Sequence, residues 1–331
     1  MILILSECED TNTDEVCYWL NHYETSFLRL NDGDNHYTID INIDNENVNP
    51  VLNINGKNIP FSDFSTVWFR RGRFYYTQPD IINVSCFKSI NDNYETANKI
   101  QNFLLQEFRI LSDYLYWHLK QNAKCFNFPS LYNINKLMVL ECAAKVGLNI
   151  PPSIVTTSKK SLNEFIKDKS FITKNISDFF ATNIGNVGLS LATKDINNLN
   201  RITDNFFYSF FQEKIEKCFE VRTFVWDNKT YSAAIYAPPE NTAAKTDFRN
   251  DYNGIKIVPY QLPQDIENKL LNLMQKVDLE SGSADFIVDN DLNFYFLEVN
   301  PVGQYDFVDK NCNYGLAKIV AETLIKNENN R

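Results

Sequence analysis

Two apolar segments near the C-terminus, joined by an acidic turn, constrain the fold of this chain more than any other feature of its sequence. Residues 283–288 and 294–299 are rich in Phe, Val, Ile and Ala, as buried strands are. Asp289, Asn290 and Asp291 lie between them and have the composition of a turn. The two segments are therefore predicted to pair as a hairpin.

Three oxygen-bearing side chains stand in or beside these apolar segments. Glu298 and Asn300 are two positions apart in an extended segment, so both side chains are predicted to leave the same face of the sheet. Pairing of the strands would bring Asp285 beside them. Carboxylate and amide oxygens are hard ligands that suit magnesium, so the hairpin is predicted to hold magnesium against a phosphate group. The alternative interpretation is a hairpin whose polar side chains simply face water.

The first part of the chain, up to about residue 130, alternates short strands with helices. The Asn55-Gly56 pair between two strand-like runs is a strong hairpin signal. Strands are predicted at residues 2–5, 37–43, 51–54, 57–59 and 65–71, and helices at 14–23 and 91–120.

A second unit is predicted to begin near residue 132. Its first helix, residues 135–146, ends at Gly147, and Pro151 and Pro152 prevent it from resuming. A loop with Gly185 and Gly188 follows a short strand–helix–strand run, and the last third is rich in strands. Further strands are predicted at residues 154–157, 171–174, 206–215, 219–226 and 231–236, and helices at 162–167, 263–277 and 314–326.

Composition excludes several classes of protein. The formal net charge of -10 argues against a general nucleic-acid binder, which needs a basic surface. The N-terminal apolar run is too short for a secretory signal, and no segment reads as a membrane span. The seven cysteines are scattered without a CxxC pair, which favours reduced thiols in a cytoplasm over disulfides or a zinc site. At 331 residues, two or three subdomains are expected.

A series of polar residues in the second unit resembles the ATP-grasp superfamily of ligases over residues 130–325. The narrower resemblance is to the maturases of ribosomally made, crosslinked peptides of the microviridin and marinostatin type, including the grasp-with-spasm group. The segments that carry this narrower resemblance are residues 67–71, 245–249 and 297–304. The residues that carry the broader one, in chain order, are Lys136, Lys174, Gln212, Glu213, Lys214, Ile215, Glu220, Arg222, Asp285, Glu298 and Asn300.

The resemblance implies the fold and its division. An α/β fold with α+β lobes is expected, namely an ATP-grasp fold preceded by an α/β pre-ATP-grasp domain. The expected boundaries are 1–130 for the N-terminal domain, 131–210 for the central lobe and 211–331 for the C-terminal lobe with the metal site.

The resemblance also implies roles for the nucleotide-binding residues. Lys136 and Lys174 would contact the phosphates, as compact ammonium donors can, although each taken alone reads as a surface lysine. Glu220 would bind the ribose hydroxyls, and Arg222 would face the γ-phosphate and the acyl phosphate; the alternative for this pair is a cross-strand salt bridge. The adenine would be read by the segment Gln212, Glu213, Lys214 and Ile215.

Two further groups of charged residues are expected to act on the substrate or to stabilise the fold. Arg249, which alternates with Lys245 and Asp247, would hold the substrate carboxylate; the alternative is a solvated loop with an internal ion pair. The cluster Arg70, Arg71 and Arg73 is open to two interpretations, a structural role at a strand end or the binding of an acidic peptide or another subunit.

The function implied is ATP-dependent activation of Asp or Glu side-chain carboxylates of a precursor peptide as acyl phosphates. Attack by a Ser, Thr or Lys side chain would then form a macrolactone or macrolactam. The expected cofactors are ATP and two magnesium ions, and the expected state is a cytoplasmic homodimer that binds neither nucleic acid nor membrane. The alternatives are an ATP-grasp ligase acting on a protein terminus or small amino acid, and a non-catalytic leader-peptide-binding protein.

Overall fold

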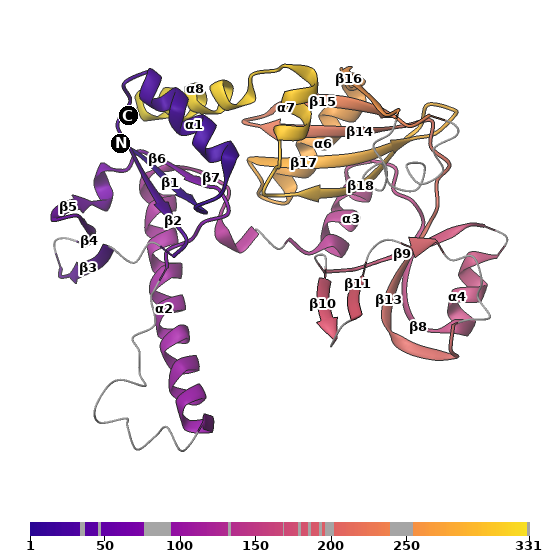
Figure 1. Ribbon diagram of the computed structural model, residues 1–331, viewed down its shortest axis with the longest axis horizontal. Coiled ribbons are helices and arrows are strands. Elements are labelled where there is room, and N and C mark those ends of the chain that lie inside the picture. The colour runs from indigo at the N-terminus through magenta and orange to yellow at the C-terminus, as the bar shows by residue number, and fades with distance from the viewer. Residues whose placement is uncertain are drawn as a thin grey trace. The chain divides into compact units, whose positions relative to one another are not determined.

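The chain folds as two compact units. The computed structural model describes residues 1–33, 37–45, 48–75, 94–131, 134–167, 169–177, 180–184, 187–191, 194–195, 202–238 and 254–329. One unit comprises Met1–Pro129 together with Leu316–Arg331, and the other comprises Ser130–Gly315 (Figure 1). The mixture of helices and sheets confirms the predicted α/β class.

Within its described residues, the first unit contains a parallel sheet, a small antiparallel sheet and three helices. Its elements are β1 (Ile2–Ser6), α1 (Thr11–His22), β2 (Phe27–Asn31), β3 (Tyr37–Ile43), β4 (Val48–Ile54), β5 (Lys57–Pro60), the 3-10 turn η1 (Phe61–Asp63), β6 (Thr66–Phe69), α2 (Tyr94–Asn122), β7 (Lys124–Phe126) and α8 (Leu316–Asn329).

Strand β1 lies inside the parallel sheet, whose order is β2-β1-β6-β7. All of its residues are buried, which explains its continuous apolar sequence, because strands of parallel sheets are covered on both faces. The predicted Asn55-Gly56 turn is confirmed, and both residues have positive φ as a tight hairpin requires.

Helix α8 belongs to the first unit, although the sequence interpretation had carried the C-terminal lobe to residue 331. It packs beside α1, and Tyr23 donates a hydrogen bond of 2.8 Å to Glu322 (Figure 1). The reason is an apolar stripe at helical spacing, Leu316, Val320 and Leu324, that is buried within this unit. The three-part division of the chain otherwise stays a prediction.

The described part of the second unit contains two sheets of four and five strands and a separate pair of antiparallel strands. Its elements are the 3-10 turn η4 (Pro129–Leu131) at its start, then α3 (Lys136–Lys145), β8 (Ser153–Ser158), α4 (Lys159–Ile166), β9 (Phe171–Lys174), β10 (Phe180–Ile184), β11 (Val187–Leu191), β12 (Lys194–Asp195), β13 (Asn205–Glu213), β14 (Phe219–Trp226), β15 (Lys229–Tyr236), β16 (Lys256–Tyr260), α6 (Gln264–Lys276), β17 (Ser281–Val288), β18 (Phe294–Asn300) and α7 (Asp306–Cys312).

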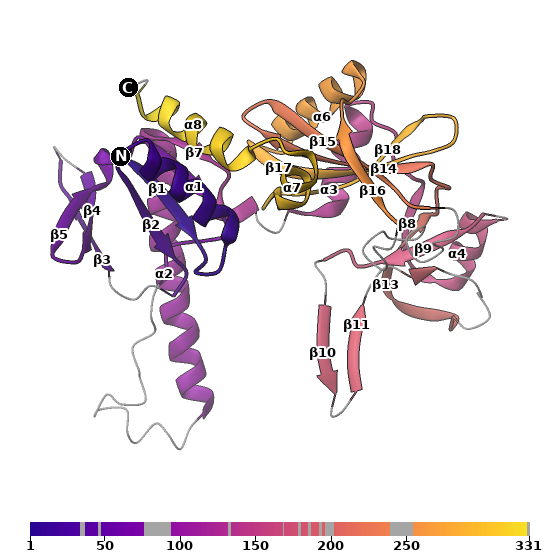
Figure 2. The same cartoon turned by 45° about the horizontal axis from the view of Figure 1, so that its top comes forward.

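The five-stranded sheet is antiparallel with the order β16-β15-β14-β17-β18. One face is apolar and packs against α3 and α6 (Figure 2). Val221, Ala284 and Phe286 supply part of that face, and Leu270 and Leu273 of α6 cover it. Strand residues alternate between faces, so the neighbours of these apolar residues point away from the core.

The four-stranded sheet has the order β12-β9-β13-β8, and α4 packs on one face. Leu162 and Ile166 of α4 bury Phe171 and Phe211 there. The residues that alternate with these, including Lys174 and Gln212, belong to the opposite face.

One predicted loop is wrong in part. Residues 180–184 and 187–191 form the antiparallel strand pair β10–β11, in which Asn183 pairs with Gly188, whereas Gly185 lies outside the described residues. The β-branched and apolar residues around the two glycines favour a strand on either side. No helix in the described part of the chain is long and apolar enough to cross a membrane.

Candidate active site

The predicted hairpin near the C-terminus is confirmed. In the β17–β18 ladder Asp285 pairs directly with Glu298, and Ser283 pairs with Asn300. Asp289 holds the turn, because its Oδ1 accepts hydrogen bonds of 2.9 and 2.8 Å from the backbone N–H groups of Asp291 and Asn293. Asp285 and Glu298 therefore leave the sheet side by side, as paired residues of an antiparallel ladder do.

A β-bulge decides which face Glu298 takes. Phe286 pairs with Phe296 and Asp285 with Glu298, so Leu297 is an extra residue on β18. Phe296 and Val299 are consequently both buried in the core, although they are three positions apart. Glu298 lies between them and takes the opposite face, where Asp285 lies.

Arg222 extends this pair of carboxylates into a row across three neighbouring strands. It pairs with Asp285 in the β14–β17 ladder, so Arg222, Asp285 and Glu298 share one face. The Arg222 side chain is only 11% exposed, and its Nε lies 3.8 Å from Asp285 Oδ1. That distance makes an ion pair without a hydrogen bond, and Nε has no hydrogen-bond partner among the described residues. The guanidinium thus keeps a buried donor for an anion.

The two predicted phosphate-binding lysines lie next to this row. Lys136 is the first residue of α3, where the Asn135 side chain caps the helix by accepting from the N–H groups of Leu137 and Met138. The Nζ of Lys136 lies 3.5 Å from Glu298 Oε2 and donates to the Ser177 carbonyl at 3.3 Å.

Lys174, the last residue of β9, places its Nζ 5.6 Å from the centre of the Phe210 ring. Burial lowers the pKa of Lys174 from its ordinary value; Glu298 and Asp285 act to raise this pKa, whereas Lys136 acts to lower it. The two lysines, Arg222 and the two carboxylates therefore form one electrostatic group with an excess of positive charge. Such a group suits a polyanion such as a triphosphate.

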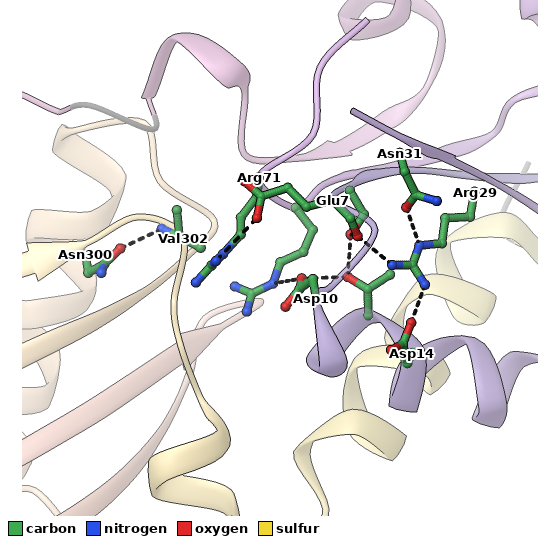
Figure 3. Close-up of polar contacts among 11 residues, drawn as sticks. Glu7, Asp10, Asp14, Arg29, Asn31, Arg71, Asn300 and Val302 are labelled. Carbon is green, nitrogen blue, oxygen red and sulfur yellow. Dashed lines mark hydrogen bonds and ion pairs between the residues drawn. The ribbon is translucent and has the colours of Figure 1, made fainter. Parts of the chain in front are cut away.

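The oxygen donors of this group fit magnesium. Asp285 and Glu298 offer carboxylates, and Asn300 offers an amide oxygen. Asn300 Oδ1 accepts a hydrogen bond of 3.0 Å from Val302 N–H (Figure 3), which leaves its second lone pair for another partner. Within the described ranges no three His, Cys, Asp or Glu side chains gather as a metal site, so this set depends on the amide.

The predicted adenine segment lies at the end of β13 and in the link to β14. Gln212 is buried and donates from Nε2 to Ser153 Oγ at 3.0 Å, whereas its Oε1 has no hydrogen-bond partner in the described part of the chain. That buried acceptor fits an amino group such as that of adenine. Ile215 is half-buried in the link.

Ion pairs hold the other members of this segment. Glu213 accepts from Lys169 at 2.7 Å, and Lys214 donates to Asp195 at 2.9 Å. The sequence did not indicate Lys169 or Asp195 as partners, because only the pairing of strands brings residues so distant in the chain together.

Glu220 and Arg222 lie on one face of β14, as predicted. Glu220 accepts a hydrogen bond from Lys217, a partner that the sequence interpretation missed although it lies only three residues earlier. The predicted ribose-binding carboxylate is therefore held in place by a neighbouring ammonium group.

Two predicted groups are not among the residues described above. Arg249, with Lys245 and Asp247, lies outside the described residues. Arg70 belongs to the first unit and is buried against Asp10, which supports the structural interpretation for this arginine.

No family model and no curated protein matches the chain by sequence. Solved structures match it over almost its whole length. The Chryseobacterium gregarium RiPP-associated ATP-grasp ligase, determined with ADP and a leader and core peptide, is 24% identical with a TM-score of 0.75 over 98% of this chain and 96% of that chain. The macrocyclase MdnC of Microcystis aeruginosa, bound with its precursor peptide, is 20% identical with a TM-score of 0.72 over 98% and 100%.

A third structure, the ATP-grasp ligase PsnB with a minimal precursor variant, Mg and ADP, is 15% identical with a TM-score of 0.67 over 98% of each chain. The chain therefore has the ATP-grasp fold. The resemblance to peptide-modifying ATP-grasp ligases, first indicated by the sequence, is confirmed at the level of the fold.

Proposed function

We propose that this chain is an ATP-dependent ligase that crosslinks a ribosomally made precursor peptide. It activates an Asp or Glu side chain of the peptide as an acyl phosphate and joins it to a Ser, Thr or Lys side chain, which forms a macrolactone or a macrolactam. The observation that carries the proposal is the row of Arg222, Asp285 and Glu298 across three strands of an ATP-grasp fold, with Lys136 beside it.

The nucleotide is assigned to the residues around this row. Lys136 and Lys174 bind its phosphates, and the buried Gln212 Oε1 accepts from the adenine amino group with Glu213, Lys214 and Ile215 beside it. Glu220 binds the ribose hydroxyls. Asp285, Glu298 and Asn300 would hold two magnesium ions, which supply charge neutralisation at the phosphates.

The reaction transfers one phosphoryl group and releases one phosphate. A carboxylate oxygen of the peptide attacks the γ-phosphorus, the bond to the β-phosphate oxygen breaks, and ADP leaves. A hydroxyl or amine of the same peptide then attacks the acyl carbon, loses its proton, and phosphate departs. Arg222 and Lys174 stabilise the negative charge on the transferred group, and Arg249 is proposed to orient the carboxylate.

The three structures described above support the peptide as substrate, because each was determined with a leader, core or precursor peptide. The main alternative, an ATP-grasp ligase for a protein terminus or a small amino acid, would use the same nucleotide residues and differ only in its acceptor. Homodimer formation and a cytoplasmic location remain part of the proposal and rest on the resemblance and on the scattered cysteines of the sequence.

The decisive experiment incubates the protein with ATP, magnesium and the precursor peptide encoded beside its gene, and follows the peptide by mass spectrometry. Loss of one water mass per ring is expected with the natural protein and not with Glu298→Gln. Asp291→Asn, the same chemical change at an exposed position in the hairpin turn, is expected to retain crosslinking. ATP consumption with an unchanged peptide would support the amino-acid ligase instead, and absence of ATP turnover with any acceptor would indicate a binding protein.

A further inference from the structure

A cluster of charged residues separate from the candidate active-site residues belongs to the first unit, where it lies at the carboxyl ends of three parallel strands. Glu7 follows β1, Asp32 follows β2, and residues 70–73 follow β6. The strand order β2-β1-β6-β7 reverses direction at β1, because the chain passes from β1 to β2 on one side and then to β6 on the other. In open parallel sheets ligands bind at the carboxyl ends of the strands where the order reverses. Glu7 and Arg71 both lie at this point.

Two arginines of the cluster, Arg29 and Arg70, have side chains that are firmly engaged within the unit. Arg29 donates to Asp14, to Asn31 and, at 2.7 Å, to the Glu7 carbonyl (Figure 3). Arg70 is buried and donates to Asp10 at 2.9 Å. The third arginine, Arg73, donates its backbone N–H to Asp32 at 2.8 Å, but its guanidinium is exposed and its Nε lies 3.9 Å from Asp32 Oδ2.

Arg71 is engaged far less than Arg29 and Arg70. Its single hydrogen bond among the described residues runs from Nη1 to Glu7 Oε2 at 3.4 Å, near the outer limit for such a bond. Its Nε has no hydrogen-bond partner in the same part of the chain. The Glu7 side chain is 47% exposed, so the pair is weak and readily exchanged.

The backbone at Arg71 is strained in a way that fits a functional position. Arg71 has φ +64°, a left-handed conformation that residues with a Cβ seldom adopt. The next residue, Gly72, lies so close to β1 that an added Cβ would stand 2.1 Å from Ser6 N. Gly72 is held against β1, and Arg70 is buried against Asp10. Because these two neighbours fix the turn, Arg71 has to adopt the left-handed conformation.

We infer that Arg71 is a carboxylate-recognition residue, at which an acidic side chain of the substrate displaces Glu7. A guanidinium binds a carboxylate through two parallel N–H donors, and Arg71 has donors to spare. The assignment of the carboxylate to the peptide rests on the proposed function, whereas binding of a carboxylate at Arg71 does not.

The test uses the full chain without ATP or metal and glutarate as the probe. The Nε–H signal of Arg71 is followed by NMR on protein labelled in its arginines and is assigned with Arg71→Lys. Glutarate is expected to shift this signal in a saturable manner. Glu7→Gln removes the competing carboxylate and is expected to tighten glutarate binding by up to about fivefold. Arg71→Gln lacks this signal, so its glutarate affinity is measured by isothermal titration calorimetry and is expected to be at least about tenfold weaker.

Arg73→Gln is the matched control, because Arg73 is the exposed arginine of the same turn; it is expected to leave the affinity unchanged. Binding that survives Arg71→Gln, or that weakens in Glu7→Gln, would overturn the inference, as would inorganic phosphate binding more tightly than glutarate. Thermal unfolding shows whether each variant is folded. If Arg71→Gln does not fold, Arg71→Lys replaces it, because lysine keeps the positive charge and lacks the planar pair of donors. The binding measurement does not depend on peptide crosslinking. A protein that crosslinks no peptide would contradict the proposed function but would leave the carboxylate site at Arg71 supported.

Discussion

Arg70 Nε lies 2.9 Å from Asp10 Oδ2, and both side chains are buried in the first unit. Thr13 Oγ1 donates to the same carboxylate oxygen at 2.8 Å, and Ser6 Oγ donates to Thr13 Oγ1 at 3.0 Å. A buried charge is tolerated only when its partners satisfy it, so this chain of contacts joins the end of β1, the start of α1 and the turn after β6.

Asp10→Asn should therefore destabilise the protein strongly, because it removes the negative charge that the buried Arg70 guanidinium contacts at 2.9 Å. The expected loss in the free energy of unfolding is about 3–5 kcal/mol. Urea denaturation measures it. Asp14→Asn, which breaks the exposed pair with Arg29, should cost no more than about 1 kcal/mol, and equal losses for the two variants would contradict the argument.

Gly72→Ala tests the close approach of the turn to β1. The new Cβ would stand 2.1 Å from Ser6 N and 2.4 Å from the Leu5 carbonyl carbon, both of them backbone atoms that cannot move aside. A loss of about 3 kcal/mol or more is expected in urea denaturation. Gly56→Ala has open space around its Cβ and only the strain of its positive φ, so about 1–2 kcal/mol is expected there.

Gly303→Ala tests the turn that follows the candidate metal ligand Asn300. Gly303 has φ +60° and donates its N–H to the Asn300 carbonyl at 3.1 Å, and an added Cβ would stand 2.9 Å from the Phe224 ring. The variant should bind Mn²⁺ more weakly, as measured by EPR, because the turn orients the Asn300 amide. Gly315→Ala shares the positive φ but not the crowding, and it should bind the metal normally.

Lys174→Met should stabilise the protein at neutral pH while weakening ATP binding. Burial lowers the pKa of Lys174, so the folded state holds the proton less tightly than the unfolded state does. Stability contributed by this group therefore rises with pH, from the lowered folded pKa up to the ordinary value of 10.5. Urea midpoints at increasing pH should show this slope in the natural protein and a smaller slope in Lys174→Met. Lys160→Met, which alters an exposed lysine, should leave the slope unchanged.

Cys17 should resist alkylation at pH 8. Burial raises the pKa of its thiol to about 11, although Arg29 acts to lower it, and the thiolate is the form that reacts. Iodoacetamide followed by peptide mapping should modify the exposed Cys8 and Cys218 well before Cys17. Modification of Cys17 at the same rate as these two would refute the argument.

Much of the secondary structure could be predicted from the sequence, because local patterns carry it. The apolar run of β1, the Asn55-Gly56 turn and the hairpin of β17 and β18 all follow from short-range signals. The order of polar residues from Lys136 to Asn300 was sufficient to indicate the fold that the structural comparison confirms.

Other features depend on contacts between distant residues. A helix is predicted over residues 314–326, and α8 (Leu316–Asn329) forms there, but only packing against α1 assigns that helix to the first unit. Lys169 reaches Glu213, and Asp195 reaches Lys214, through the pairing of strands that no local pattern specifies.

The sequence by itself determined which side chains could hold a nucleotide and a metal, and that Asp285 and Glu298 stand in neighbouring strands. Tertiary structure alone decided which way Glu298 points. Counted by alternation from Phe294 and Phe296, Glu298 would share the core face of the sheet with the two phenylalanines. The extra residue Leu297 reverses the count, because a bulge forms where burial of Phe296 and Val299 on one face outweighs regular pairing.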